Sequence, residues 1–191
     1  MKKISFAVSL IAVLATAGCM TTPQPRSSTN SNTTATTNAD PVASATVFAV
    51  NEDAAAGSII HKVTSVETLD SIPKSYTLAD WQVIAEDLPA DEGFQWVHIK
   101  GTVTNNSKQT QTVTSSSLYV MDAADNEYDV STDTTIYVPE DASPVYLNLQ
   151  PTQNRDWEGY FMVPTTAKGL VLVGDDLSFA PKDVIKVDLG L

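Results

Sequence analysis

Residues 94–104 read FQWVHIKGTVT, an alternation that is typical of a β-strand with two differently packed faces. One face takes the aliphatic side chains and a glycine, namely Val97, Ile99, Gly101 and Val103. The opposite face takes Trp96, His98, Lys100 and Thr102. Asn105, Asn106 and Ser107 follow, and these residue types favour turns. We therefore expect a strand that ends in a turn at Asn105.

Short alternating segments of this kind recur from Val47 to Leu191, and no segment repeats at helical spacing. The segments expected as strands are 58–66, 81–85, 94–104, 118–123, 127–130, 145–149, 157–163, 169–174 and 183–189. Short strands separated by polar turns predict an all-β fold, an antiparallel immunoglobulin-like β-sandwich of about eight strands over residues 47–191. Residues expected between the two sheets are Val97, Ile99, Val103, Phe161, Val163, Ile185 and Val187.

Three short motifs in this region resemble those of a family of bacterial lipoproteins. They are GTVTNNS at 101–107, the segment from Tyr119 to Tyr128 with its central Asp122, and the pair Leu149-Gln150-Pro151 and Phe161-Met162-Val163-Pro164. Over about residues 59–189 the chain is similar to the family called domain of unknown function 4352. The resemblance implies an immunoglobulin-like β-sandwich and a place in the cell envelope, and it implies no activity.

The chain departs from the family pattern at two turns. Asn126 stands where the family has a turn glycine, and an asparagine can still adopt the left-handed conformation. Thr152 stands where the family has the glycine of a Pro-Gly turn, and we expect a different turn there.

The N-terminus has the order of a secretory signal. Lys2 and Lys3 precede an apolar run over residues 4–17, which is shorter than the roughly 20 residues of a membrane-spanning helix. Thr16-Ala17-Gly18-Cys19 resembles the lipobox of bacterial lipoproteins, although Thr16 replaces the usual aliphatic residue. We expect a signal over residues 1–18 and an acylated Cys19 that contacts the lipid bilayer. Ordinary cleavage after Ala17 is the alternative, and it would leave Cys19 as a free thiol.

Residues 19–46, called the tether here, are rich in Thr, Ser and Asn. We expect the tether to be disordered, because it has too few apolar side chains to offset the loss of conformational entropy on ordering. A coil of this length spans about 30 Å between its ends. In Gram-negative lipoproteins, an Asp directly after the acylated Cys retains the protein at the inner membrane. Met20 occupies that position here, so the resemblance implies an outer-membrane location.

Charge and motifs exclude several functions. From Val47 onward the chain has eight Lys and Arg against 22 Asp and Glu, so backbone binding of nucleic acid is not expected. We expect no metal and no cofactor, because only His61 and His98 are histidines and they lie on separate expected strands.

One hairpin is rich in the oxygen-bearing side chains that calcium prefers, but their spacing is not that of an EF-hand loop. These residues are Asp122, Asp125, Asn126, Glu127 and Asp129. No nucleophile elbow or phosphate loop is present, so we expect no enzyme.

The sequence thus predicts an envelope-anchored, non-enzymatic module that contacts an envelope protein or cell-wall polymer. The alternative is a carrier of a small ligand or divalent cation. Phe94, Trp96 and His98 share the outer face of the first strand described above and are the candidate partner contact. The competing interpretation is that residues 70–93 fold back over this face and bury it.

Overall fold

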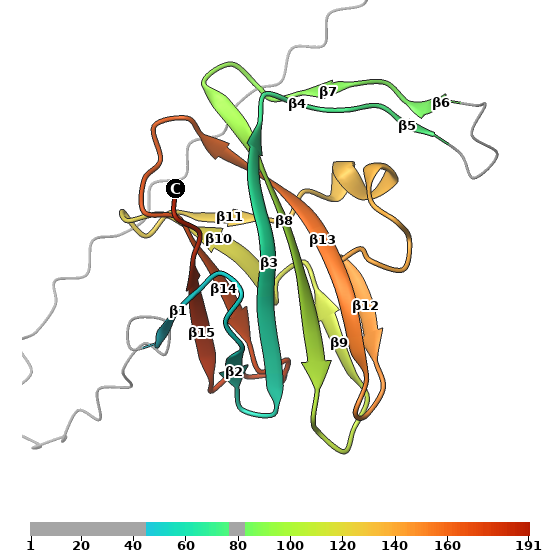
Figure 1. Ribbon diagram of the computed structural model, residues 1–191, viewed down its shortest axis with the longest axis vertical. Coiled ribbons are helices and arrows are strands. Elements are labelled where there is room, and N and C mark those ends of the chain that lie inside the picture. Colours follow the sequence, from blue (N-terminus) through green and yellow to red (C-terminus); the bar gives the residue numbers. More distant parts are fainter. Residues whose placement is uncertain (1–44, 77–82) are drawn as a thin grey trace, which may run out of the picture. The chain divides into compact units, whose positions relative to one another are not determined.

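The structure, a computed structural model, describes residues 45–76 and 83–191. The expected signal, Cys19 and nearly all of the tether lie outside the described residues. Two antiparallel sheets and a two-stranded ribbon form the body of the domain, as Figure 1 shows. The prediction of a β-sandwich is confirmed.

The first sheet has the strand order β13-β8-β3-β2 and is antiparallel throughout. The alternating segment at 94–104 becomes its long central strand, β8. A bulge between Val63 and Ser65 shifts the register of β3 against β8 and turns Thr64 out of the ladder. The strands of this sheet are β2 (Ala54–Ala56), β3 (Ile59–Leu69), β8 (Phe94–Asn105) and β13 (Asn154–Pro164).

The second sheet has the order β1-β15-β14-β10-β11. Its pairings are antiparallel except that β1 runs parallel to β15. A separate ribbon pairs β9 (Gln111–Thr114) with β12 (Tyr146–Leu149). The strands of the second sheet are β1 (Val47–Ala49), β10 (Leu118–Met121), β11 (Glu127–Asp129), β14 (Val171–Asp175) and β15 (Val184–Asp188).

The main core lies between the two sheets, and all seven predicted core residues belong to it. Each of them is at most 2% exposed, so the predicted register of β8, β13 and β15 is confirmed: Val97, Ile99, Val103, Phe161, Val163, Ile185 and Val187. The pleat explains this result, because successive side chains of a strand point to opposite faces.

Beyond the sandwich a narrow double-stranded arm extends from the end of β3 and returns into β8 (Figure 1). Its pairs are β4 with β7 and β5 with β6. Ile72 of the arm packs with Trp96, Val138 and Tyr160 in a second apolar cluster, here called the outer cluster. The arm strands are β4 (Ser71–Ile72), β5 (Ser75–Tyr76), β6 (Val83–Ala85) and β7 (Leu88–Pro89).

Each of the nine segments expected as strands contains all or part of a strand of the structure, and the short strands β1, β2, β4, β5 and β7 were not expected. Within the described ranges, eight strands have four or more residues. The sequence missed β9, and it missed the 3-10 helix η1 (Thr132–Tyr137), which lies in a stretch rich in Thr and Asp. Of the expected strand at 81–85, residues 83–85 form β6 and the first two residues lie outside the described part.

Candidate functional site

The three predicted contact residues do not form one exposed patch. Phe94 is 40% exposed, whereas Trp96 is 1% and His98 is 5% exposed. The Trp96 Nε1 atom donates a hydrogen bond to the Leu88 carbonyl of the arm at 3.2 Å. The expectation of an exposed aromatic face is therefore wrong for Trp96 and His98. Part of the segment at 70–93 folds back over Trp96. His98 is instead enclosed by side chains of the neighbouring strands β3 and β13. Contact of Phe94 with a partner stays a prediction.

His98 is the centre of a polar cluster that joins three strands. Its ring stacks on Tyr160, with centroids 4.1 Å apart and planes at 13°. Its Nδ1 lies 2.7 Å from Glu67 Oε1 on β3, and its Nε2 lies 3.1 Å from Glu158 Oε2 on β13. Both ring nitrogens of His98 are therefore within hydrogen-bonding distance of a carboxylate. Burial, followed by the charges of Glu158 and Glu67, raises the pKa of Tyr160 to about 12, so its phenol stays protonated.

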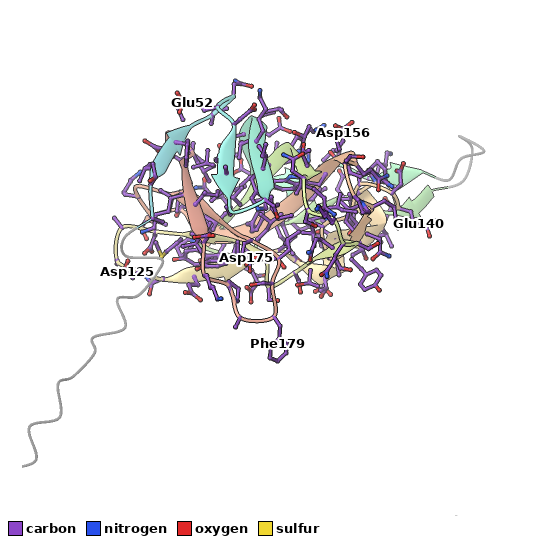
Figure 2. All side chains as sticks on the ribbon, turned by 90° about the horizontal axis from the view of Figure 1, so that it is seen from below. Glu52, Asp125, Glu140, Asp156, Asp175 and Phe179 are labelled. Carbon is purple, nitrogen blue, oxygen red and sulfur yellow. The ribbon has the colours of Figure 1, made fainter. Side chains whose placement is uncertain are left out.

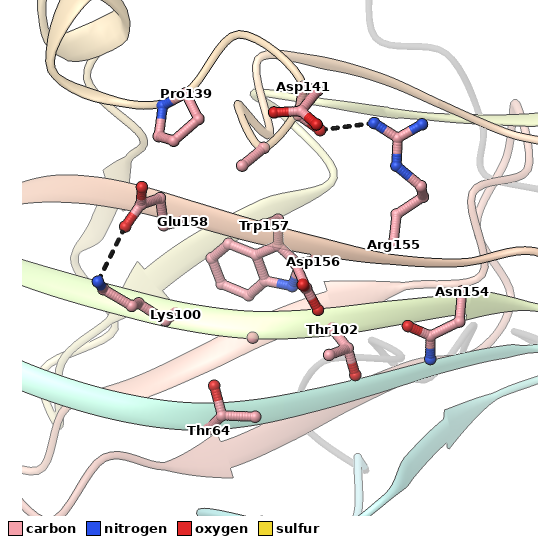
Figure 3. A pocket seen from close by; sticks show the side chains of 12 residues that line it. Thr64, Lys100, Thr102, Pro139, Asp141, Asn154, Arg155, Asp156, Trp157 and Glu158 are labelled. Atoms are coloured by element: carbon pink, nitrogen blue, oxygen red, sulfur yellow. Dashed lines mark hydrogen bonds and ion pairs between the residues drawn. The ribbon is translucent and has the colours of Figure 1, made fainter.

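A charged hollow of about 680 Å³ lies beside this cluster, on the outer face of β8 and β13. Figure 3 shows Lys100 and Glu158 at one end of it and Arg155 at the other. Lys100 Nζ lies 3.2 Å from Glu158 Oε2. Arg155 Nη2 donates to the main-chain oxygen of Asp141 at 2.7 Å, and no carboxylate of the described residues lies within 4.0 Å of its guanidinium. Most donors of Arg155 are thus available to a ligand.

An apolar hollow of about 990 Å³ adjoins the charged one, and Pro139 and Asp141 line both hollows. Ile136, Val138, Val145 and Tyr146 contribute its apolar walls. Ile136 is 51% exposed and Tyr146 is 69% exposed. Together the two hollows, here called the paired hollows, place apolar side chains and an available arginine on adjoining surface.

The wall that carries Ile136 is held at both ends. The Ser131 amide donates to the Tyr160 carbonyl of β13 at 2.9 Å, and Thr134 Oγ1 donates to the Ser131 carbonyl at 2.7 Å. Tyr137 Oη donates to the Glu86 carbonyl of the arm at 2.6 Å. Sequence reasoning missed this surface. The available signal was the run Ile136-Tyr137-Val138 inside an otherwise polar segment.

The family-like motif residues have structural roles. Asn105 is fully buried, and its Nδ2 donates to the carbonyls of Gln109 (2.8 Å) and Leu149 (3.0 Å), which ties the end of β8 to the end of β12. Its Oδ1 accepts from the Ser107 amide at 2.9 Å. These bonds join the first and third motifs to each other, so neither motif marks a ligand site.

The acidic hairpin is organised by Asp122. Its carboxylate accepts from the amides of Ala124 and Asn126, from Asn126 Nδ2 and from Tyr128 Oη, at 2.8 to 2.9 Å. The bonds from Asn126 come first among the causes that lower the pKa of Asp122 to about 2, and burial opposes them. The left-handed residue of this turn is Asp125, with φ 62°, and not Asn126 as expected.

His61 lies fully buried between the sheets. Its Nε2 lies 2.8 Å from the Asp175 carbonyl, to which the neutral ring donates, and its ring packs against Gly174. Burial lowers the pKa of His61, and the bond to Asp175 only partly opposes that effect. His61 and His98 therefore lie on opposite faces of the first sheet. Among residues 45–76 and 83–191 no three His, Cys, Asp or Glu side chains are grouped to hold a metal ion.

The fold defines a two-sheet β-sandwich domain, and comparison with known families gives its relationship. The family model "Domain of unknown function (DUF4352)" matches residues 48–184, so the chain belongs to this family. The crystal structure of the yjhA protein from Bacillus subtilis is similar with a TM-score of 0.52 and 11% identity, and it covers 74% of this chain and 99% of that one.

Two further solved structures show lower similarity. An uncharacterized β-sandwich protein from Clostridium difficile 630 has a TM-score of 0.45 and 11% identity, covering 76% of this chain and 94% of that one. The ycdA protein from Bacillus subtilis, named as a candidate lipoprotein, has a TM-score of 0.48 and 13% identity, covering 72% of this chain and 38% of that one. No curated protein matches the chain.

Within the described residues, no helix has the length and apolar composition to cross a bilayer.

Proposed function

We propose that this protein is a lipid-anchored envelope protein whose β-sandwich binds a segment of another envelope protein at the paired hollows, without catalysing a reaction. The observation that carries the proposal is the pair of exposed apolar side chains, Ile136 and Tyr146, around a hollow next to Arg155. Aromatic residues and arginine are enriched among residues that dominate binding energy.

The geometry of the paired hollows supports a preformed protein-binding surface. The wall that carries Ile136 is bonded to both β13 and the arm, so little ordering entropy is lost when a partner binds. The apolar hollow would take aliphatic or aromatic anchors, and the free donors of Arg155 suit a carboxylate or carbonyl of the same partner. Apolar anchors surrounded by a polar rim are the usual anatomy of protein interfaces.

The anchoring part of the proposal depends on Cys19 and the residues before it. A diacylglyceryl group on Cys19, with a further acyl chain, would hold the protein firmly on a membrane, because each buried CH₂ contributes about 0.8 kcal/mol. Met20 supports the outer membrane as the address. Cys19→Ala should leave an uncleaved or mislocalised protein in cell fractionation. A wild-type mature chain that begins at Gly18 without a lipid, in mass spectrometry, would refute the anchor.

The binding part is tested by crosslinking in the native envelope. A photoreactive amino acid at position 146 should give a discrete crosslinked product, which the substitution Ile136→Ser in the same chain should reduce at least tenfold. Val47→Ser is the matched control, because it removes a β-branched aliphatic side chain of similar exposure, 57% against 51% for Ile136, from another part of the surface. Products that persist after Ile136→Ser, or that Val47→Ser also removes, would contradict the assignment.

The charged hollow favours one alternative, a carrier of a small polar ligand. Asp141, Asp156 and Glu158 line this hollow together with Lys100 and Arg155, so a small molecule with both charges would find partners. A rise in melting temperature with a small anionic ligand that is lost in Arg155→Gln, or with a divalent ion that is lost in Asp156→Asn, would favour the alternative over a protein partner.

A further inference from the structure

Phe179 lies at the tip of the loop at residues 176–183, which connects β14 to β15. Its side chain has no cover, since its relative exposure is 108%, and Figure 2 shows it projecting from the loop. Ala180, Pro181 and Lys182 follow it and are also exposed. Burial of a fully exposed phenylalanine by a partner would remove most of its apolar surface from water, which is the gain available to a contact at this tip.

The loop is built to hold this position. Asp176 accepts hydrogen bonds from the Ser178 amide at 3.0 Å and the Ser178 hydroxyl at 2.6 Å, and from the amides of Lys182 and Asp183 at 3.3 and 3.4 Å. Burial raises the pKa of Asp176, but these bonds outweigh it and hold the pKa below its ordinary value. Leu177 packs against the main core with φ 56°. Phe179 is thus presented on an ordered loop.

The loop also lies at the point where the tether enters the domain. Ala45 and Thr46 line a small hollow together with Lys182, Asp183 and Val184. The Lys186 amide donates to the Thr46 carbonyl at 3.1 Å. If Cys19 is held in a membrane, the tether therefore joins that membrane to the domain at a point beside the Phe179 loop.

We propose that Phe179 docks the domain onto the bilayer that carries the acylated Cys19, inserting into the interface between headgroups and acyl chains. This inference rests on the lipid anchor of the proposed function. A coil of the tether's length would have a root-mean-square span of about 30 Å, which corresponds to an effective concentration in the millimolar range. A contact that is too weak to recruit a free domain can therefore hold a tethered one.

The charge of the domain specifies the lipid. With 22 acidic and eight basic residues from Val47 onward, the domain is repelled by an anionic surface. Near the tip, the Asp176 carboxylate is turned to its four donors, and Lys182 is exposed. A zwitterionic surface such as phosphatidylcholine or phosphatidylethanolamine is the occupant that this loop fits.

The test uses the full-length acylated protein in phosphatidylcholine vesicles that contain some doxyl-labelled lipid. Ala180→Cys introduces one reactive thiol beside an intact Phe179, and it is labelled with an environment-sensitive fluorophore. Glu140→Cys, on the exposed segment between the paired hollows, is the matched control position. Because acylation blocks the Cys19 sulfur, the protein without either substitution should take up no label.

We expect the label at position 180 to shift its emission to shorter wavelength and to be quenched by the doxyl lipid, and the label at position 140 to do neither. Adding Phe179→Ser to Ala180→Cys should lower the docked-to-undocked ratio about tenfold or more, which is the effect of removing one buried phenylalanine. Anionic lipid in the vesicles should lower the same ratio.

Two results would overturn the inference in different ways. If Cys19 labels in the unsubstituted protein, the anchor is absent, and both the anchored function and the docking fail. If Cys19 takes up no label, but the label at position 180 is neither shifted nor quenched, as at position 140, only the docking proposal is refuted. Quenching that is unchanged by Phe179→Ser would likewise overturn the role of Phe179.

Discussion

Thr152 adopts a backbone conformation that its side chain disfavours. Its φ is 65°, in the left-handed region, where a β-branched residue is a genuine outlier. The expectation of a different turn at this departure from the family's Pro-Gly pair was wrong. Thr152 takes the glycine-like conformation, and its amide donates to the Asn105 carbonyl at 2.7 Å. The turn is fixed by that bond and not by the residue type.

Thr152→Gly should therefore stabilise the domain. Relief of left-handed strain is worth about 1–2 kcal/mol, and the added freedom of glycine in the unfolded chain offsets about 0.5–1 kcal/mol of it. Urea unfolding should show a rise of about 0.5–1 kcal/mol in the free energy of unfolding. Thr152→Ala keeps a side chain in the left-handed region and serves as the control. A less stable glycine variant would contradict the strain.

Asp122 should make the domain sensitive to acid. Its pKa in the folded state is lowered from 3.8 to about 2, so the unfolded chain binds its proton first as pH falls. The stability it contributes is present above pH 3.8 and is lost as pH falls toward about 2. Asp122→Asn should reduce stability at neutral pH and flatten its pH dependence in that window. Urea unfolding across the window tests this, and an unchanged pH profile would refute it.

At the scale of elements, the arm and β8 form one packing unit. Trp96 is 1% exposed and meets Tyr160 edge to face, with ring centroids 6.5 Å apart. Its indole N–H reaches the carbonyl of Leu88 at the base of the arm. The arm thus covers the outer face of the first sheet near the start of β8.

Trp96→Ala should reduce the free energy of unfolding by about 3–5 kcal/mol, because it opens a large cavity in the outer cluster. Phe94→Ala, on the same face of the same strand but 40% exposed, should change it by only about 0.5 kcal/mol. Thermal and urea unfolding of both variants give the comparison. Equal effects of the two substitutions would mean that the arm does not cover Trp96 in solution.

Sequence patterns predicted strands whose two faces differ in polarity. The alternation in β8, β13 and β15 places the main core correctly, because the period of a strand fixes which side chains share a face. The pattern could not reveal that Trp96 and His98 are covered. The cover of Trp96 comes from residues 70–93, and that of His98 comes from side chains of β3 and β13. Only tertiary structure brings these segments beside β8. The paired hollows were missed because residues from η1, β12 and β13 form them jointly.

At the scale of the whole molecule, like charge opposes compaction. From Val47 onward 22 acidic residues face eight basic ones. Within the described residues, two lysine–carboxylate pairs occur, Lys62 with Asp53 and Lys100 with Glu158, and His98 contacts two carboxylates. Most carboxylates therefore repel one another across the surface without a cation nearby.

Added salt should raise the melting temperature of the domain. At low ionic strength the repulsion acts over tens of ångströms, whereas near physiological salt the screening length falls to about 8 Å. The melting temperature should rise from low to physiological sodium chloride and then level off. Scanning calorimetry at constant pH tests this, with sodium and potassium chloride compared to exclude a specific ion. A melting temperature that falls with salt would show that attractive pairs dominate.

The parallel pairing of β1 with β15 has a mechanical consequence for a protein held by its N-terminus. Only three residue pairs join β1 to the sheet, from Val47 with Lys186 to Ala49 with Asp188. Tension along the N-terminal segment enters the fold at this strand. Because β1 is short and lies at the edge of its sheet, it would detach before the long strands of the first sheet separate. Under load the N-terminal segment would lengthen by a few residues while the proposed binding surface kept its shape.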